Sequence, residues 1–378
     1  NAKPWGQKGI PDDFAFGTLP EDIDHIAPYL ESATRRVPVL QKTGVQLFFN
    51  GPESFTPDDR YLLGETPEVP GLFCATGFNS IGILSSGGVG KALADWIRDR
   101  RPPVELMDVD VRRVQAFQGN RAYLEERTTE TLGLLFDMHW PYRQFATARD
   151  IRRSPFHDRL KALGACMTEA AGWERPGFFG APGTMPEIGY SYGRQSWFDA
   201  CGAECRNTAE NVTLFDHSCF VKYQVEGRDA LALLNRVCAN QIDVAVGRVV
   251  YTQWLNGQGG IEADVTVTRL SKTAFLVVTI AVSQRRDLAW LKRQIPDGAH
   301  VFATDVTSGL PILALMGPKA RALLRRISPA DFSDAAFPFG TSQEIDLGYA
   351  RVRASRLTYV GEQGYELYMP AEFATHVF

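Results

Sequence analysis

The chain has 378 residues, of which 44% are hydrophobic and 22% are charged. This balance is typical of globular protein and excludes a disordered or low-complexity chain, while the length allows two or three domains. The 40 Lys and Arg nearly balance 44 Asp and Glu, and no basic tract stands out, so we expect no nucleic-acid partner. The apolar runs are too short to cross a bilayer, so we expect no membrane partner.

The six cysteines and six histidines show no spacing typical of metal ligands. Cys201 and Cys205 form the only close pair, and their spacing differs from the C-x-x-C of zinc and redox sites. We interpret that pair as a coincidence and predict no metal. The pattern favours a reduced, intracellular protein, cytoplasmic or, in a eukaryote, in the mitochondrial matrix.

The first part of the chain predicts two short strands and one helix. The strands are expected at 45–49 and 72–76. A glycine-rich turn at 77–90 then leads into a helix at 91–98. The prolines that follow Arg101 end this helix and predict a domain boundary at 103.

The rest of the chain predicts a connecting module at 104–165 and a third domain at 166–378. A Gly/Pro/aromatic-rich stretch at 172–179 is expected to open that domain as an ordered loop. Strands then alternate with occasional helices, so the predicted fold class is α+β and multidomain. The expected strands are 249–255, 261–270, 274–280, 310–316 and 348–357, with helices at 229–237 and 318–327.

The glycine-rich turn has the form of an anion site, because free backbone N–H groups and the positive end of a helix dipole meet there. Neither common phosphate motif is present: G-x-G-x-x-G is absent, and Ser85 and Ala92 stand where the P-loop pattern requires Gly and Ser or Thr. From the residues alone, a tight strand-to-helix crossover that only packs on a sheet is an equal alternative.

The segments GLFCATGFNSIGI at 71–83 and GGVGKALADWI at 87–97 resemble the last FAD-binding segment of dimethylglycine and sarcosine dehydrogenases. The lead-in at 59–69 and the stretch at 145–157 are also similar to this family. The resemblance implies that the turn lies against the flavin ring of FAD. The implied FAD-binding residues are Gly77, Phe78, Asn79, Ser80, Ile81 and Gly82.

A carboxylate interrupts the expected strand at 261–270. Strand alternation places the apolar side chains of Ile261, Ala263, Val265 and Val267 on one face and Glu262, Asp264, Thr266 and Thr268 on the other. Because strands disfavour Asp, Asp264 needs an explanation. It is either part of a solvated polar face or a ligand-facing group at the floor of a pocket.

Several motifs around this strand, in the right order, resemble the aminomethyltransferase fold of the glycine-cleavage T-protein. They are LFDHS at 214–218, YTQWLNGQGGI at 251–261, the strand around Asp264, and RLTYVGEQGYE at 356–366. The resemblance implies a tetrahydrofolate site in which Asp264 is the essential aspartate and Glu366 hydrogen-bonds the pterin. Tyr251 and Tyr359 are the implied tyrosines of the folate pocket.

From the residues alone, bland alternatives remain. Glu362 and Glu366 are also explained as turn and edge-strand charges, and Asp216 and His217 are better explained as a structural corner than as catalysts. The chemistry nevertheless suits the folate interpretation. A carboxylate can accept paired hydrogen bonds from the donor edge of a pterin, and aromatic rings can pack on its flat face.

Together the two resemblances imply a flavin-dependent N-methylglycine dehydrogenase. Such an enzyme oxidises a small N-methyl amine, passes electrons to oxygen or an electron-transfer flavoprotein, and gives the one-carbon unit to tetrahydrofolate. The alternatives are a stand-alone folate-dependent demethylase or aminomethyltransferase, and a non-catalytic relative that regulates pyruvate dehydrogenase phosphatase. We expect the chain to be cut at both ends, because the dinucleotide fingerprint of the family and its last strands are missing.

Overall fold

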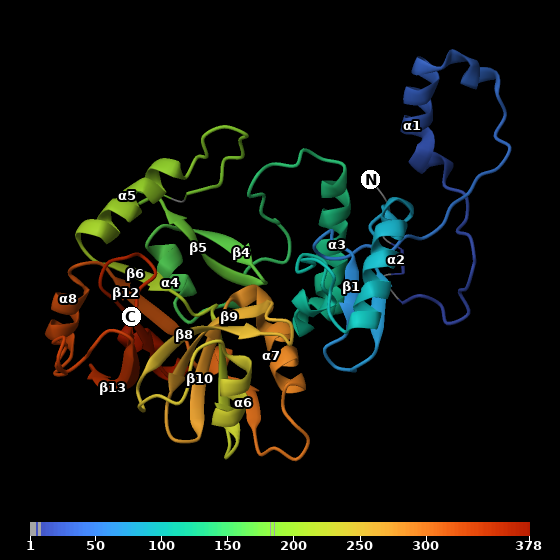
Figure 1. Ribbon diagram of the computed structural model, residues 1–378. Helices are drawn as coiled ribbons and strands as arrows, with labels where there is room; N and C mark the ends of the chain where they lie inside the picture. The colour runs from blue at the N-terminus through green and yellow to red at the C-terminus, as the bar shows by residue number, and fades with distance from the viewer. Residues whose placement is uncertain (1–4, 7–8, 182, 185) are drawn as a thin grey trace. The chain divides into compact units, whose positions relative to one another are not determined.

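The computed structural model describes residues 5–6, 9–181, 183–184 and 186–378 (Figure 1). The chain separates into two compact units. Unit 1 consists of Asn1–Gly64, Cys74–Val109 and Gly119–Asp137, and unit 2 consists of Glu65–Phe73, Asp110–Gln118 and Met138–Phe378. The segments of each unit are interleaved along the chain, so neither unit is one continuous stretch of sequence.

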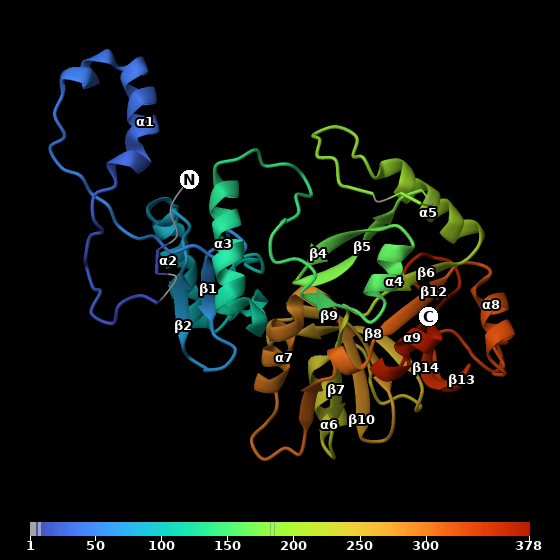
Figure 2. The ribbon, with the colours of Figure 1, turned by 180° about the vertical axis from the view of Figure 1, so that it is seen from behind.

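Unit 1 contains three helices and most of a two-stranded sheet (Figure 2). The elements are α1 (Ile23–Arg36), β1 (Leu62–Glu65), β2 (Phe73–Thr76), α2 (Gly82–Asp99) and α3 (Arg121–Leu135). Trp96 of α2 is buried and lies directly against Gly64. A Cβ on residue 64 would lie 2.4 Å from that ring, so glycine is required for the packing.

Two expectations for unit 1 need correction. No strand forms over 45–49: within this fully described segment the side chains of Val45, Leu47 and Phe49 are exposed, and no partner strand pairs with it. Apolar residues make a strand only where a ladder satisfies the backbone. The glycine-rich stretch is also mostly helical, because α2 begins at Gly82 rather than at residue 91. The strand at 73–76 agrees with its prediction.

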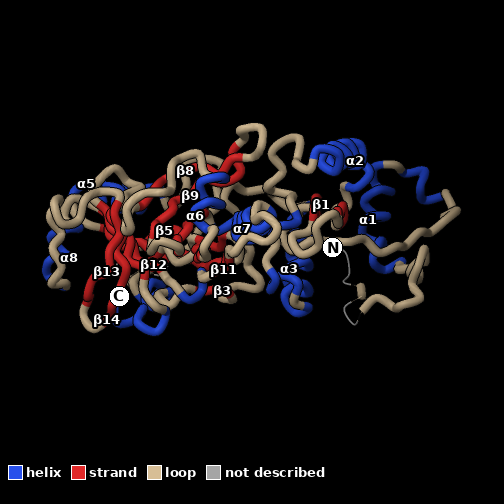
Figure 3. Tube along the Cα trace, turned by 60° about the horizontal axis from the view of Figure 1, so that its bottom comes forward, coloured by secondary structure: helices blue, strands red, loops and turns tan. Residues whose placement is uncertain are grey.

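Unit 2 is built on two five-stranded sheets and one three-stranded sheet, whose strands are red in Figure 3. The strand orders are β11-β7-β10-β9-β8, β13-β14-β15-β12-β6 and β3-β5-β4. Neighbouring strands run antiparallel, except that β3 and β5 are parallel. The strands are β3 (Arg152–Arg153), β4 (Ala165–Ala170), β5 (Trp173–Phe179), β6 (Thr213–Asp216), β7 (Val221–Glu226), β8 (Val249–Leu255), β9 (Ile261–Arg269), β10 (Ala274–Thr279), β11 (Phe302–Asp305), β12 (Ile312–Met316), β13 (Thr341–Leu347), β14 (Ala350–Arg356) and β15 (Gly364–Tyr368).

Helices cover these sheets. They are α4 (His157–Ala162), α5 (Phe198–Glu210), α6 (Ala230–Val237), α7 (Gln284–Arg293), α8 (Ala320–Ile327) and α9 (Ala374–Val377). Short 3₁₀ turns occur at Pro38–Lys42, Val111–Arg113, Ala116–Gly119, Ala281–Ser283, Thr307–Gly309 and Ala371–Phe373. The architecture therefore confirms the predicted mixed, multidomain α+β class.

Each large sheet has its own apolar core. Tyr223 and Trp254 are fully buried in the core under α6 and α7, and Phe332 and Tyr365 in the core under α8. A third cluster combines residues of both sheets, namely Leu276, Val278, Ile312 and Tyr368. The two sheets of unit 2 are thus joined by packed side chains, and β12 and β15 lie at that junction.

The predicted elements from 229 onward agree with the structure, but one earlier expectation does not. Residues 172–179 were expected to form a loop, and most of them form β5, which pairs with both β3 and β4. A bulge next to Cys166 accommodates the Pro and Gly of this strand. The alternation predicted for β9 holds for Ala263, Val265 and Val267, which are buried, whereas Ile261 is exposed.

We predict that Gly227→Ala destabilises unit 2. Gly227 has φ +132°, and an added Cβ would lie 2.1 Å from the backbone oxygen of His300. Strain and this clash should lower the free energy of unfolding by roughly 2–4 kcal/mol. Urea unfolding followed by tryptophan fluorescence measures the change. Gly257→Ala is the matched control, because nothing lies within 4 Å of its added Cβ, and an equal loss in both variants would contradict the prediction.

Candidate functional site

Asp264 lies on β9 within a hairpin that also presents its two partners. Gln253 of β8 stands directly opposite Asp264 in the strand register. Its Nε2 donates to Asp264 Oδ1 at 2.9 Å, and the Tyr251 hydroxyl donates to Asp264 Oδ2 at 2.9 Å. Both carboxylate oxygens are therefore held, although the side chain is exposed. The described residues do not enclose Asp264 in a cavity, but they fix its direction.

Tyr251 stays protonated beside this carboxylate. The hydrogen bond to Asp264 is the largest cause that raises the pKa of the Tyr251 phenol above its ordinary value. An ionised phenol next to an ionised carboxylate would be repelled, whereas the neutral phenol donates a hydrogen bond. The Tyr251 hydroxyl therefore remains the donor in this hydrogen bond at neutral pH.

Glu366 lies on β15, between β12 and β14, and is fully buried. Its Oε1 is 3.0 Å from His217 Nδ1, and its Oε2 accepts a hydrogen bond from the Tyr368 hydroxyl. Because buried charges are costly unless they are paired, these two contacts are what allow a carboxylate at this central position. The alternative that Glu366 is an edge-strand charge is excluded by its place in the sheet.

An aromatic group covers the Glu366 carboxylate. The His217 ring stacks on Phe220 with centroids 4.5 Å apart, and Tyr359 meets His217 edge-on at 5.8 Å. Tyr359 also meets Phe220 edge-on at 6.0 Å. Such offset and edge-to-face contacts are typical of packed aromatic rings. His217 is mostly buried, with 15% of its side chain accessible, whereas none of the Glu366 side chain is accessible.

Tyr359 connects the two carboxylates electrostatically. More than half of its surface is exposed, yet desolvation raises the pKa of its phenol, and the negative charges of Glu366 and Asp264 raise it further. Tyr251 contributes in the same direction. Glu366, Asp264 and Tyr251, which come from two different sheets, therefore all act on the Tyr359 phenol. Their roles stay predictions.

Lys222 is a second buried charge beside Glu366. It lies on β7 with none of its surface exposed, and its Nζ donates to the Ser218 backbone oxygen at 2.9 Å. Burial lowers the pKa of Lys222 to about 8, while Cys219, Asp216, Asp305 and Glu366 act to raise it. The negative charges around Lys222 thus favour its charged form, but burial outweighs them.

The sequence analysis did not identify Tyr368 or Lys222 as neighbours of Glu366, and it assigned His217 to a structural corner. Tyr368 shares a strand face with Glu366 two residues away, and this spacing could have indicated the contact. Lys222 carries no local signal, because only folding brings it near. His217 was interpreted as part of a corner. Asp216 does form that corner, accepting hydrogen bonds from Ser218 N and the Ser154 hydroxyl, but His217 points to Glu366.

The residues proposed for FAD form a tight turn in unit 1. Gly77, Asn79 and Ser80 all have positive φ, between 50° and 68°. Asn79 is buried and holds the turn: its Oδ1 accepts from Thr56 N at 2.8 Å and its Nδ2 donates to Gly77 O at 2.9 Å. Phe78 stacks on Tyr61 at 5.1 Å. Ile81 precedes α2 without a side-chain cap, which leaves the start of the helix available to an anion.

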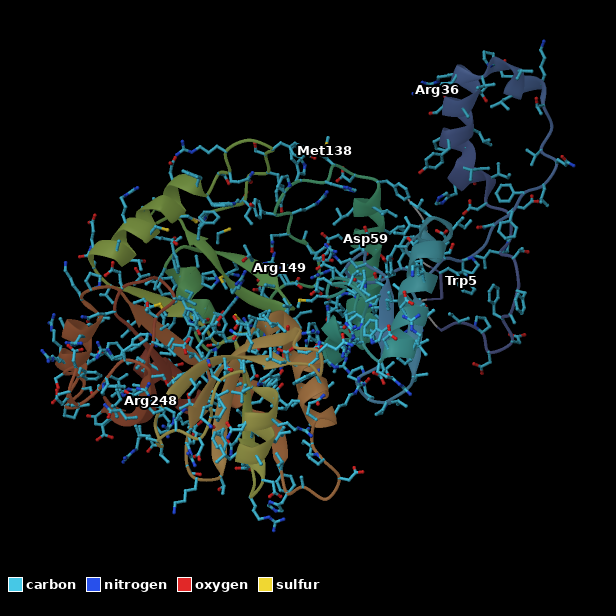
Figure 4. All side chains as sticks on the ribbon, viewed as in Figure 1. Trp5, Arg36, Asp59, Met138, Arg149 and Arg248 are labelled. Atoms are coloured by element: carbon cyan, nitrogen blue, oxygen red, sulfur yellow. The ribbon has the colours of Figure 1, made fainter. Side chains whose placement is uncertain are left out.

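The structure also brings together three possible metal ligands, Asp150, His157 and Glu174, whose ligand atoms lie within 4.8 Å of one another. Glu174 is already held by Arg149, which Figure 4 labels, through two contacts of 2.6 Å. His157 contacts Asp150 and Asp158 at 2.9 Å each. Ion pairing therefore accounts for the cluster, and the expectation of no metal stays a prediction.

Three known protein families match successive parts of the chain. The GCVT N-terminal domain family matches residues 156–378, which is more than half of the chain. The FAD dependent oxidoreductase family matches residues 7–96, and the FAD dependent oxidoreductase central domain matches 101–154. The chain belongs to the FAD-dependent oxidoreductases that carry a GCVT domain. Both resemblances drawn from the sequence are thereby confirmed at the level of the family.

Curated relatives are similar over nearly the whole chain. A 4-methylaminobutanoate oxidase (formaldehyde-forming) of Paenarthrobacter nicotinovorans is 46% identical over 96% of this chain and 44% of its own length. The mitochondrial pyruvate dehydrogenase phosphatase regulatory subunit of Mus musculus is 36% identical over 100% of this chain and 44% of its own. Human mitochondrial sarcosine dehydrogenase is 32% identical over 100% and 45%. The chain thus spans less than half the length of these relatives.

Within the part of the chain that the structure describes, none of the helices combines the length and apolar character needed to span a bilayer.

We predict that the burial of Lys222 makes stability depend on pH. The pKa of Lys222 is 10.5 in the unfolded chain and about 8 in the folded protein. Below pH 8 the side chain is charged in both states, so the folded state bears the full cost of burying the charge. Between pH 8 and 10.5 the unfolded state binds more protons, so stability rises with pH, by about 3 kcal/mol. The measurement is the difference in unfolding free energy between wild type and Lys222→Met. A difference that does not change from pH 7.5 to 10.5 would contradict the assignment.

Proposed function

We propose that the chain is part of a flavin-dependent enzyme that oxidises a small N-methyl amine, such as sarcosine or dimethylglycine, and transfers the one-carbon unit to tetrahydrofolate. The family matches to FAD-dependent oxidoreductases and to the GCVT domain support this function. The observations that carry it are the hydrogen bond between Tyr251 and Asp264 and the contact of Tyr359 with His217, whose ring is hydrogen-bonded to Glu366. The product would be 5,10-methylenetetrahydrofolate and the demethylated amine.

The turn at 77–82 suits an FAD-binding role. Its backbone is locked by Asn79, and the start of α2 lacks a side-chain cap, so N–H groups there can face a negative group. When bound, FAD supplies the acceptor for the hydride that leaves the N-methyl group. Gly77, Phe78, Asn79, Ser80, Ile81 and Gly82 would contact it, with Ser80 held by Glu53. Electrons would pass on to oxygen or an electron-transfer flavoprotein.

The group around Tyr359 suits a pterin. A flat ring can pack on the exposed part of Tyr359 and next to His217. Because Glu366 is fully buried behind His217, we propose that the two act as one unit, in which Glu366 sets the charge and orientation of the imidazole. Each carboxylate oxygen has a second lone pair, so Glu366 can also accept directly from the pterin if His217 shifts.

Asp264 is the proposed catalytic residue. The amine of tetrahydrofolate must lose a proton when it attacks the iminium carbon of the oxidised substrate. A carboxylate held by Tyr251 and Gln253 and open on its remaining side can accept that proton and stabilise the positive charge.

We expect the protein to act in the cytoplasm, or in the mitochondrial matrix if its source is a eukaryote.

A second candidate function is non-catalytic regulation. It is favoured by the 36% identity to a pyruvate dehydrogenase phosphatase regulatory subunit over the whole chain. The two candidates differ in a simple observation on the full-length protein. An enzyme is expected to be yellow and to reduce a dye when an N-methyl amine is added, whereas a colourless protein without turnover would support the regulatory function.

We predict that Asp264→Asn in the full-length protein separates the two reactions. Amine-dependent dye reduction should persist, while methylenetetrahydrofolate formation should fall by roughly 10²–10⁴-fold, the usual contribution of a positioned base. Formaldehyde should rise in proportion, because the untrapped iminium hydrolyses. Both products are measured in the same reaction. Asp243→Asn, an exposed carboxylate paired with Arg269, is the control and should change neither. An equal fall of both activities in Asp264→Asn would show that the assigned role is wrong.

We predict that Glu366→Gln weakens tetrahydrofolate binding by roughly 10–100-fold, since a hydrogen bond to a charged group contributes about 1.5–3 kcal/mol. Calorimetric titration of the full-length protein measures the affinity. Glu344→Gln on β13 is the matched control, because Glu344 is exposed and pairs only with Arg351 and Arg353. Unchanged affinity in a folded Glu366→Gln protein would remove Glu366 from the site.

A further inference from the structure

A cavity of unit 2 is lined by none of the residues proposed to bind folate or FAD. Its volume is about 490 Å³. Arg152 of β3 and Trp173 of β5 contribute to its wall, together with the hydroxyl residues Ser154, Ser218, Thr307 and Ser308. A cavity of this volume lies within the range of small-molecule sites. Its lining combines the Trp173 indole, several hydroxyl groups, the guanidinium groups of Arg152 and Arg153, and the paired side chains of His157 and Asp158.

Arg152 is held in place by contacts that leave most of its donors unused. The strand register sets Arg152 opposite Trp173, and its guanidinium lies over the indole ring, 4.1 Å from the centroid. Nη2 donates to Gln284 Oε1 at 2.6 Å, and Nη1 contacts the Ala171 backbone oxygen at 3.4 Å. A guanidinium has five N–H donors, so three remain for another acceptor.

No carboxylate of the described residues forms an ion pair with Arg152. Asp305 is linked to it through Gln284, which accepts from Arg152 and donates to Asp305 Oδ2 at 2.6 Å. Asp305 raises the pKa of Arg152, but burial outweighs this and lowers the pKa to about 10. The neighbouring cation on the wall, Arg153, is paired with Asp158 at 3.2 Å. Arg152 is therefore a half-buried charge without a matching anion.

We propose that this cavity binds a small organic carboxylate through Arg152. The planar guanidinium matches a carboxylate in two parallel hydrogen bonds, and its stacking on Trp173 fixes the plane in which the ligand must lie. Ser308 also lines the cavity, and its hydroxyl can serve as a further donor. One unpaired cation suits a singly charged anion better than a phosphate dianion, which would require a second positive group.

The test is a binding titration that does not depend on catalysis or on folate. Full-length protein is titrated with trifluoroacetate and followed by ¹⁹F NMR line broadening. Arg152→Gln should lower the affinity of the proposed cavity for trifluoroacetate at least tenfold. Arg153→Gln, the matched control on the same wall, should change that affinity by less than twofold. Because the comparison is between variants, binding of the probe to any flavin site cancels. Acetate should displace this component, and inorganic phosphate should not.

Ser308→Leu provides a second variant that fills the cavity and leaves Arg152 intact. Ser308→Leu should also abolish the trifluoroacetate binding assigned to the cavity. If circular dichroism shows that Arg152→Gln is unfolded, the result for Ser308→Leu tests the proposal instead. A titration unchanged from wild type in Ser308→Leu, or in folded Arg152→Gln, overturns the proposal. Stronger displacement of trifluoroacetate by phosphate than by acetate overturns the assignment to a carboxylate.

Discussion

The buried carboxylate of Glu366 is the constraint on which the second unit depends. It lies on β15, the central strand of a five-stranded sheet, at the junction where the two large sheets pack together. Removing such a charge from water costs several kcal/mol unless it is paired. His217 and Tyr368 provide the pairs, and Lys222 adds a cation from the other sheet. The position of each of these elements is therefore tied to one charge that must be neutralised.

The two carboxylates of the candidate site have opposite environments, and this difference suits different tasks. Asp264 is exposed and held by two donors of its own hairpin, so it can exchange a proton with a bound amine. Glu366 is fully buried and held by His217 and Tyr368, which suits the orienting role proposed for it. Tyr359 lies in the field of both.

The sequence predicted what depends on local pattern and missed what depends on distant contacts. Alternation of period two was enough to place Asp264 opposite the core face of β9, and the strands expected at 249–255 and 261–270 are those that pair as β8 and β9. The contact of His217 with Glu366 joins residues 149 positions apart, which no local pattern reveals. The same holds for β5: its Pro and Gly indicated a loop, but pairing on both edges makes it a strand. Residues 45–49 show the reverse, an apolar run without a ladder.

The turn before α2 shows how strain and exposure are combined at a candidate ligand site. Positive φ at Asn79 and Ser80 is costly for residues with a side chain, and it persists because Asn79 is buried and bonded to Thr56 and Gly77. Thr56 is in turn held by Thr131 of α3, so the strain is supported from a second helix. A turn needed only to connect β2 to α2 could use glycine at these positions without strain. A strained turn that is tied down on both sides and leads into an uncapped helix start is better explained by a ligand that requires its shape.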